Sequence, residues 1–247
     1  MGDYGGDGDR PFAVICADPK GYWPCCANPV SLRTNHTGRI QMSLIVHHLN
    51  NSRSQRVLWL LEELELPYEL RAYQRDAVTN LAPPELKAIH PLGKSPLLEA
   101  AGDVIQESGA IVQYLIDTHG NGRFQPSAAD ALRHSQFMHF AEGSAMTPIL
   151  LQLYTSRLGD AAAPLTPRIT EQLGSHFAYL ESELRPSGHF VGDDWTGADV
   201  MLSFPAEIAV MQGAGAQFPK LAAFVAAAHA RPAWQRAREK GGAYYGY

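Results

Sequence analysis

Hydrophobic and polar residues follow no regular pattern in the first 41 positions, and a clear one begins at Met42. The early segment holds six glycines and four prolines and shows no sustained period of two or 3.6 residues. Segments of this composition are typical of disordered chains. We therefore predict a disordered extension over residues 1–41, upstream of a folded protein that begins at Met42.

Residues 42–119 alternate between strand and helix patterns and predict a small α/β domain. A β-α-β unit is followed by a β-β-α unit, which together form a small sheet covered by helices. In the first helix Leu58, Leu61 and Leu64 recur at helical spacing, so one face should enter the core while glutamates occupy the other faces. The predicted strands are 43–48, 68–73, 96–99 and 104–106, and the predicted helices are 54–64, 84–88 and 108–118.

The remainder of the chain is helical in character. Residues 120–126, Gly-Asn-Gly-Arg-Phe-Gln-Pro, have the composition of a linker. Thr196 and Asp199 stand three apart before an apolar run and predict a capping box, with a role in folding rather than in chemistry. We predict an all-helical C-terminal domain over residues 127–247, with helices at 127–158, 166–184, 197–212, 218–230 and 232–240.

Charge and hydropathy argue for a small-molecule ligand. The net charge is −5, the pI is about 6.0 and lysine and arginine form no dense run, which argues against nucleic acid or an anionic membrane as partner. No apolar stretch approaches the roughly 20 residues of a membrane span. The acidic, glycine-rich start also lacks the features of a secretory signal. We therefore expect a cytoplasmic protein with no membrane or nucleic-acid partner.

The positions of the cysteines and histidines limit the kinds of catalytic and metal site that the chain can form. The three cysteines, Cys16, Cys25 and Cys26, all precede Met42, so the patterned part of the chain contains no thiol. Cysteine nucleophiles, protein disulfides and thiolate metal sites are thereby excluded from it. The histidines form no metal-ligand spacing, and we predict no metal site.

Residues 92–108 carry the strongest sign of a binding site. A Ser95-Pro96 bend leads into a hairpin, and the hairpin leads into a helix that begins at Glu107-Ser108. A cis proline at such a bend leaves the backbone N–H and C=O of Ser95 free to pair with an extended peptide. The helix start and the Ser108 hydroxyl suit a carboxylate, Glu107 suits an ammonium group, and Lys94 suits a second carboxylate.

From Met42 onward the chain resembles a cytosolic glutathione transferase of the bacterial and fungal type related to the theta class. The resemblance rests on the order and spacing of five motifs rather than on any single one. It implies a thioredoxin-like N-terminal domain, an all-helical C-terminal domain that shapes the second-substrate pocket, a homodimer, and glutathione as co-substrate. The motifs are Asn-Asn-Ser-Arg-Ser-Gln-Arg-Val at 50–57, Gly-Lys-Ser-Pro at 93–96, Gln-Glu-Ser at 106–108, the capping box at 196–199, and Phe-Pro to Arg-Pro-Ala at 218–233.

The resemblance implies a role for each binding residue. Ser95, followed by a cis Pro96, would pair by its backbone with the cysteinyl part of glutathione. Glu107 and Ser108 would hold the γ-glutamyl end, and Lys94 would lie near the glycyl carboxylate. These roles agree with the interpretation drawn from the residues themselves, because glutathione is an extended tripeptide with a carboxylate at each end.

Activation of the glutathione thiol is expected at the start of the first helix. There a hydrogen-bond donor and the helix dipole would lower the pKa of the thiol. In theta-like enzymes the donor is a serine, and the matching position here is Asn51, with Ser52 next to it and Ser54 in the following turn. We rank Ser52 first and Asn51 second, since a one-residue shift in a loop is easy and an amide N–H also donates.

Conjugation of the glutathione thiolate to small hydrophobic electrophiles is the predicted reaction. A glutathione-dependent peroxidase or disulfide reductase is the alternative on the same scaffold, and a non-enzymatic binding module is a third. The second-substrate pocket is less well marked, because its candidates on the long helix also suit a core. These candidates are Phe137, Phe140, Glu142, Met146 and Tyr154.

Overall fold

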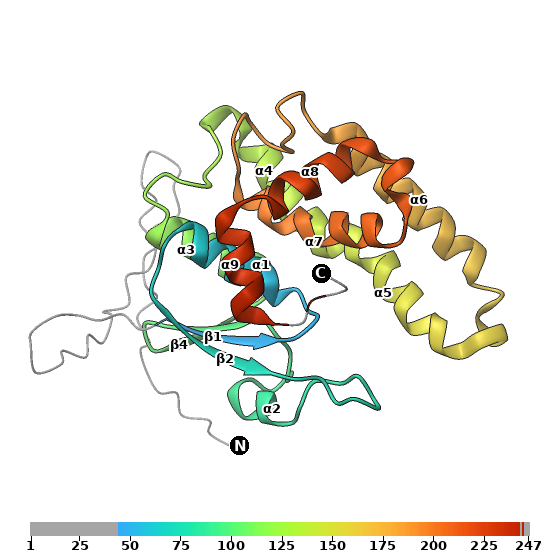
Figure 1. Cartoon of the computed structure of the whole chain (residues 1–247), viewed down its shortest axis with the longest axis horizontal. Helices are drawn as coiled ribbons and strands as arrows, with labels where there is room; N and C mark the ends of the chain where they lie inside the picture. Colours follow the sequence, from blue (N-terminus) through green and yellow to red (C-terminus); the bar gives the residue numbers. More distant parts are fainter. Residues whose placement is uncertain (1–43, 243, 245–247) are drawn as a thin grey trace, which may run out of the picture.

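The computed structural model describes residues 44–242 and 244, and the predicted extension at 1–41 lies outside them. Within the described part of the chain, an α/β unit is followed by a run of helices (Figure 1). The predicted fold class, a thioredoxin-like domain followed by an all-helical domain, is confirmed.

The four strands of the α/β unit form one sheet in the order β2-β1-β3-β4. Strand β1 pairs with β2 in parallel and with β3 antiparallel, and β3 pairs antiparallel with β4. Five of the six residues of β1 and three of the four of β3 are buried, so these central strands are covered on both faces of the sheet. The strands are β1 Leu44–Leu49, β2 Tyr68–Tyr73, β3 Leu97–Ala100 and β4 Asp103–Gln106.

Helices cover the sheet on both sides. In Figure 1, α1 (Ser54–Glu63) and α3 (Ser108–His119) lie above the strands, and the short α2 (Glu85–Ile89) lies below them. The helix α1 follows β1 after a loop of four residues, so its N-terminus opens at the carboxyl end of the central strand. This arrangement brings the loop between β1 and α1 next to the Ser95–Pro96 bend.

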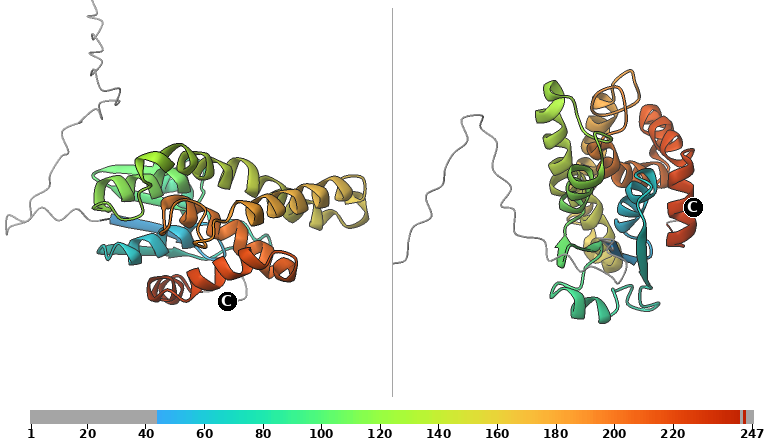
Figure 2. Two further views of the ribbon diagram at one scale, coloured as in Figure 1. Left: turned by 90° about the horizontal axis from the view of Figure 1, so that it is seen from above. Right: turned by 90° about the vertical axis from the view of Figure 1, so that its left-hand side faces the viewer.

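The helical part is built from six α-helices in the described chain, connected by short 3-10 and π turns. Helices α5 and α6 run side by side and extend away from the sheet (Figure 2). The bounds are α4 Ala131–Phe140, α5 Met146–Thr155, α6 Thr166–Glu183, α7 Gly197–Met211, α8 Pro219–His229 and α9 Pro232–Gly241, with 3-10 turns at Ala128–Asp130, Ser156–Ala162 and Ala214–Ala216.

The prediction of one uninterrupted helix over 127–158 is wrong. A π-helical turn, Ala141–Ala145, separates α4 from α5, and a 3-10 segment replaces the end of the expected helix. The π turn contains Gly143, a weak helix former. It also contains Glu142, whose carboxylate pairs with two arginines of the first domain. A tertiary ion pair therefore accompanies the change in helical register.

Helix α1 is amphipathic as predicted, with Leu58, Leu61 and Leu64 buried in the core, but its opposite face is covered as well. The last helix, α9, returns from the helical domain and packs along the outer face of α1 (Figure 1). Glu62 accepts hydrogen bonds from Arg236 at 2.9 Å and from Lys240 at 2.5 Å, and Glu63 pairs with Arg231. Glu62 and Glu63, on the faces predicted for the glutamates, thus bind the basic side chains of α9.

A single hydrophobic core joins the two parts of the chain. Trp59 of α1 packs edge-on against Trp195, with ring centroids 5.4 Å apart and planes at 80°. The predicted capping box is present: the Asp199 carboxylate accepts from Thr196 N at 2.8 Å and from Phe190 N at 2.8 Å. Because the fully buried Asp199 carboxylate also binds Phe190, it joins the loop before α7 to the start of that helix.

Candidate functional site

The Ser95–Pro96 bend closes the end of β1. Its peptide bond is cis, as predicted. The Ser95 hydroxyl donates to the carbonyl of His47 at 2.8 Å and accepts from the N–H of Leu49 at 3.1 Å. Among the described residues, no backbone–backbone hydrogen bond outside the helices and strands reaches Ser95. Its side chain therefore fixes the bend while its own N–H and C=O stay available to an added strand.

The start of α3 lies beside this bend. In the β3–β4 register Leu97 is opposite Gln106, so the residues before Leu97 lie next to those after Gln106. Ser108 is buried and begins α3, whereas Glu107 is exposed and has a positive φ of 69°. A non-glycine residue at positive φ is uncommon and is often found at ligand sites. The structure thus brings Ser95 and Pro96 close to Glu107 and Ser108, with Lys94 exposed on the near side of the bend.

The loop between β1 and α1 holds both candidates for thiol activation. Ser52 is 6% exposed, and its hydroxyl donates to the carbonyl of Leu49 at 2.7 Å. The same hydroxyl accepts from Ser54 N at 3.2 Å. Asn51 is less buried and has a positive φ of 48°. Since Leu49 N binds Ser95, this loop and the bend are directly joined.

Arg75 binds this loop from outside, although no local sequence signal marks it. Its backbone N–H donates to the side-chain oxygen of Asn50 at 2.8 Å. Its guanidinium donates to the carbonyls of Asn50 at 3.2 Å, Asn51 at 3.3 Å and Asn80 at 3.1 Å. A lone arginine after a strand has no local signal that distinguishes it from a surface residue, so only the fold could show this role.

A buried cation lies behind the start of α3. Arg56 is 1% exposed and donates to the carbonyl of Met201 at 2.6 Å and to the Ser108 hydroxyl at 3.4 Å. It also forms an ion pair with Glu142, which Arg53 shares. Two guanidiniums and one carboxylate leave net positive charge beside Ser108, which favours an anion there. The partner of Arg53 is thus a partly buried carboxylate of the other domain.

Burial alone would raise the pKa of the Glu142 carboxyl, but the guanidiniums of Arg56 and Arg53 outweigh it and hold this pKa below 4.5. A lowered folded-state pKa contributes stability above the unfolded-state value, and that stability is lost as the pH falls through the folded-state pKa. We therefore expect Glu142→Gln to lower the free energy of unfolding by about 1–3 kcal/mol at pH 7 and to reduce its fall in acid. Urea unfolding between pH 7 and pH 3 measures both effects.

The matched control for this experiment is Glu171→Gln. Glu171 pairs with Arg168 on the surface of α6, where both side chains are about two-thirds exposed. Exposed pairs contribute little, so this variant should match the wild type at every pH. Equal acid dependence in wild type and Glu142→Gln would show that the ion pair contributes nothing to acid stability.

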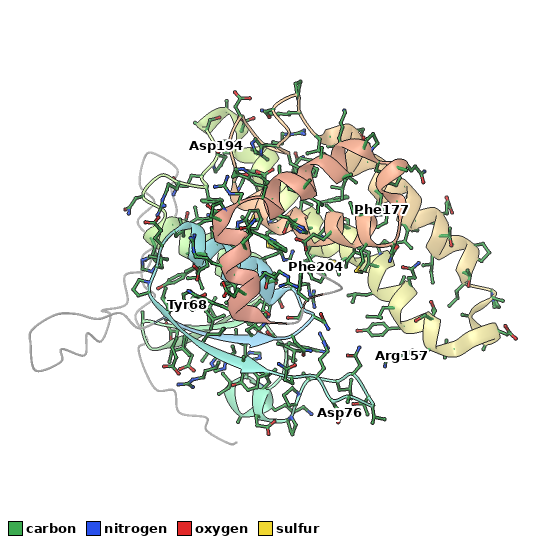
Figure 3. The ribbon with its side chains drawn as sticks, in the orientation of Figure 1. Tyr68, Asp76, Arg157, Phe177, Asp194 and Phe204 are labelled. Atoms are coloured by element: carbon green, nitrogen blue, oxygen red, sulfur yellow. The ribbon has the colours of Figure 1, made fainter. Side chains whose placement is uncertain are left out.

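The candidates for the second-substrate pocket separate into two groups. Phe137 and Met146 are buried in the core, and Phe140 packs against Tyr179 with ring centroids 5.1 Å apart. Tyr154, by contrast, is 59% exposed near the end of α5. Just after α5, the guanidinium of Arg157 lies 3.5 Å from the carbonyl oxygen of Thr79. The C-terminal end of α5 therefore lies near the loop after β2 (Figure 3).

Within residues 44–242 and 244, no three His, Cys, Asp or Glu side chains are grouped so that they could hold a metal ion. None of the helices in that part of the chain is long and apolar enough to cross a bilayer. A hollow of about 620 Å³ lies between the linker and the 191–196 loop, and it includes none of the predicted site residues.

Two family models match the chain in tandem. The model for the N-terminal domain of glutathione S-transferase matches residues 42–117, and the model for its C-terminal domain matches residues 143–232. The first covers the bend, the start of α3 and the loop between β1 and α1. All the predicted binding residues therefore lie within the N-terminal match.

Individual relatives agree with this match. Glutathione S-transferase 1 of Saccharomyces cerevisiae is 34% identical over 187 residues, which cover 66% of this chain and 80% of the relative. A glutathione S-transferase of Actinobacillus pleuropneumoniae superposes with a TM-score of 0.74 at 32% identity, covering 82% of this chain and 94% of the other. The glutathione transferase URE2P8 of Phanerochaete chrysosporium, solved with oxidized glutathione, superposes with a TM-score of 0.68 at 26% identity. The superposition covers 81% of this chain and 95% of the other.

Proposed function

The chain belongs to the glutathione S-transferase family, and on that basis we propose how its own residues bind glutathione and activate the thiol. Its activity is that of a glutathione transferase, which joins the sulfur of glutathione to an electrophilic carbon. Glutathione is its co-substrate. The single observation that supports the residue roles best is the proximity of the Ser95 backbone, the Ser108 hydroxyl and the loop before α1 in one region of the fold.

Glutathione binds as an added strand along the bend. The N–H and C=O of Ser95 pair with its cysteinyl backbone, in the place that the cis Pro96 leaves open. Its γ-glutamyl carboxylate lies at the N-terminus of α3, near the Ser108 hydroxyl, and its ammonium group lies near Glu107. Arg56 behind Ser108 supports the carboxylate end of this arrangement. Lys94 meets the glycyl carboxylate at the other end.

Thiol activation is assigned to Asn51, with Ser52 as support. The sequence favoured Ser52, but the buried Ser52 hydroxyl already donates to the carbonyl of Leu49. Asn51 is more exposed in the same loop, and its amide N–H is a suitable donor to a thiolate. The N-terminus of α1 adds its positive dipole end. A hydrogen bond to the charged sulfur favours thiolate over thiol and so lowers the pKa of the bound thiol.

The second substrate is a small hydrophobic electrophile held between α5 and the loop after β2. Arg75 links the loop after β2 to Asn51, because its guanidinium donates both to the carbonyl of Asn80 in that loop and to the carbonyl of Asn51. On the loop, Val78 is 93% and Leu81 is 62% exposed, and Tyr154 on α5 is 59% exposed. We call residues 50–53, between β1 and α1, the activating loop. Exposed apolar side chains on two facing segments next to this loop suit an apolar substrate.

A homodimer in the cytoplasm is the proposed state of the protein. Exposed apolar side chains occur on the strand and helix away from the activating loop, with Val104 of β4 at 40% and Leu132 of α4 at 73% exposure. An apolar surface of this kind is typical of contacts between copies.

Binding and activity measurements on the full chain test the proposal. We expect calorimetry to detect glutathione binding and a chloronitrobenzene to be conjugated faster than a hydroperoxide or a mixed disulfide is reduced. Light scattering should give twice the chain mass of 27.0 kDa. No binding at millimolar glutathione would contradict the assignment of the site, and faster reduction than conjugation would favour the peroxidase or reductase alternative.

A further inference from the structure

A chain of buried polar groups lies beneath the activating loop. His48, near the end of β1, is 2% exposed, and its Nδ1 lies 2.8 Å from the Ser54 hydroxyl. The Ser54 hydroxyl lies 2.7 Å from the Ser52 hydroxyl, and Ser54 is fully buried. Three polar side chains thus connect the interior of the α/β unit with the loop that contains Asn51.

The far end of this chain is attached to α9. His48 Nε2 lies 3.0 Å from the carbonyl oxygen of Gly241, the last residue of that helix. A Cβ at position 241 would meet Gln55 Oε1 at 3.0 Å, Leu58 at 3.0 Å and His48 Cε1 at 3.2 Å. Glycine therefore allows the end of α9 to approach close enough for the hydrogen bond. The last helix of the second domain reaches the activating loop of the first through one imidazole.

The hydrogen-bond partners determine the direction of each proton. A carbonyl only accepts, so Nε2 of His48 carries the hydrogen and donates to Gly241. Burial lowers the pKa of His48 from 6.5 to about 4, and the hydrogen bond to Gly241 offsets only part of that drop. The ring is therefore neutral near pH 7, and its Nδ1 is an acceptor. Ser54 donates to Nδ1, which leaves the Ser54 oxygen to accept from Ser52.

The direction of these hydrogen bonds decides whether the Ser52 hydroxyl can donate to a ligand. The Ser52 hydroxyl has a single hydrogen, and both acceptors within reach of it, the carbonyl of Leu49 and Ser54 Oγ, are buried protein atoms 2.7 Å away. Ser52 then holds the loop rather than donating outward to a ligand. The loop is fixed from inside by His48, Ser54 and Ser52 and from outside by Arg75, which binds the carbonyl of Asn51.

We propose that His48 is a positioning residue for the transferase reaction, acting through Ser54 and Ser52 to hold the loop that presents Asn51 to the glutathione thiol. The inference rests on the proposed function, because it assumes that the loop between β1 and α1 contacts the sulfur. It assigns no contact between His48 and glutathione. Loss of the His48 hydrogen bonds would displace the Asn51 donor. It should therefore change turnover and thiol activation more than glutathione binding.

Two amide substitutions at position 48 separate the two ends of the imidazole. In His48→Asn the side-chain oxygen takes the place of Nδ1 and accepts from Ser54, while the bond to Gly241 is lost. In His48→Gln the amide reaches the place of Nε2 and donates to Gly241, while the acceptor for Ser54 is lost. Steady-state kinetics and the ultraviolet absorbance of the bound thiolate are measured for the full-length wild type and both variants.

We expect His48→Gln to lower kcat about tenfold, with the KM for glutathione changed by less than about twofold, since one positioning hydrogen bond is lost. His48→Asn should stay within about threefold of the wild type. Wild-type kcat in His48→Gln, equal losses in the two variants, or a rise in KM that matches the fall in kcat would each overturn the proposal. If the wild type itself forms no thiolate, the proposed function fails and not merely the role of His48.

A second variant covers the case in which His48→Gln does not fold. Ser54→Ala removes the middle of the chain and leaves the bond between His48 and Gly241 in place, so it should reproduce the tenfold loss of kcat. The matched control is His134→Gln, because His134 is a comparably buried histidine, 5% exposed, on α4. It should keep wild-type kcat, and a tenfold loss there would attribute the effect to any buried histidine and overturn the proposal.

Discussion

Replacing Asn51 with alanine should lower kcat/KM for conjugation by about 10- to 150-fold, because the thiolate loses its side-chain donor. A hydrogen bond to a charged group contributes about 1.5–3 kcal/mol, which corresponds to a rate change of this size. The absorbance of bound thiolate at neutral pH should fall in parallel. Glutathione should still bind, since Ser95, Glu107 and Ser108 are unchanged.

Two further variants make this result specific. Asn51→Asp has the same shape but replaces the amide donor with a carboxylate, so it should lose at least as much activity as the alanine variant. Ser52→Ala removes a support of the loop and should cost about tenfold, as for the other members of the buried chain. A larger loss in Ser52→Ala than in Asn51→Ala would assign the sulfur contact to Ser52, as the sequence had ranked it.

Replacing Asp199 with alanine should lower the free energy of unfolding by about 3–5 kcal/mol, the largest stability effect we expect for a single residue. The carboxylate is fully buried and accepts from Phe190 N, Thr196 N and the Thr196 hydroxyl, at 2.7–2.8 Å. Its removal leaves these donors buried without an acceptor. Urea unfolding followed by circular dichroism measures the loss.

Thr196→Ala is the matched comparison, because it removes only the hydroxyl from the same box. Loss of a helix cap typically costs about 1 kcal/mol, so this variant should be clearly more stable than Asp199→Ala. Equal losses in the two variants would show that Asp199 stabilises only the cap and does not also hold the loop at Phe190.

Much of the proposed binding site could be predicted because its signals are local. The Ser95–Pro96 bend and the Glu107–Ser108 helix start are separated by one short hairpin, and strand pairing brings them together. Backbone groups at a bend and at a helix end need no particular long-range partner to become available. Local sequence was therefore enough to propose an extended, doubly charged ligand at this site.

The residues that the sequence did not reveal act through distant partners. Arg56 reaches Met201 and Glu142, and His48 reaches Gly241, across separations of 86 to 193 residues. Nothing in the neighbouring sequence distinguishes a buried arginine or histidine of this kind from an ordinary surface residue. Our proposal of Asn51 ahead of Ser52 likewise depends on distant segments, because it uses the hydrogen bonds that His48 makes with Ser54 and with the end of α9.

The order of the elements, the fold class, the capping box and the cis bond at Ser95–Pro96 were predictable from local sequence. These follow from periodicity, turn chemistry and capping, which operate over a few residues. Tertiary contacts were needed to show that α9 covers α1, that a π turn places Glu142 on Arg53 and Arg56, and that His48 lies within hydrogen-bond distance of Ser54. Burial and the satisfaction of buried polar groups depend on which distant segments meet, and local patterns do not encode that choice.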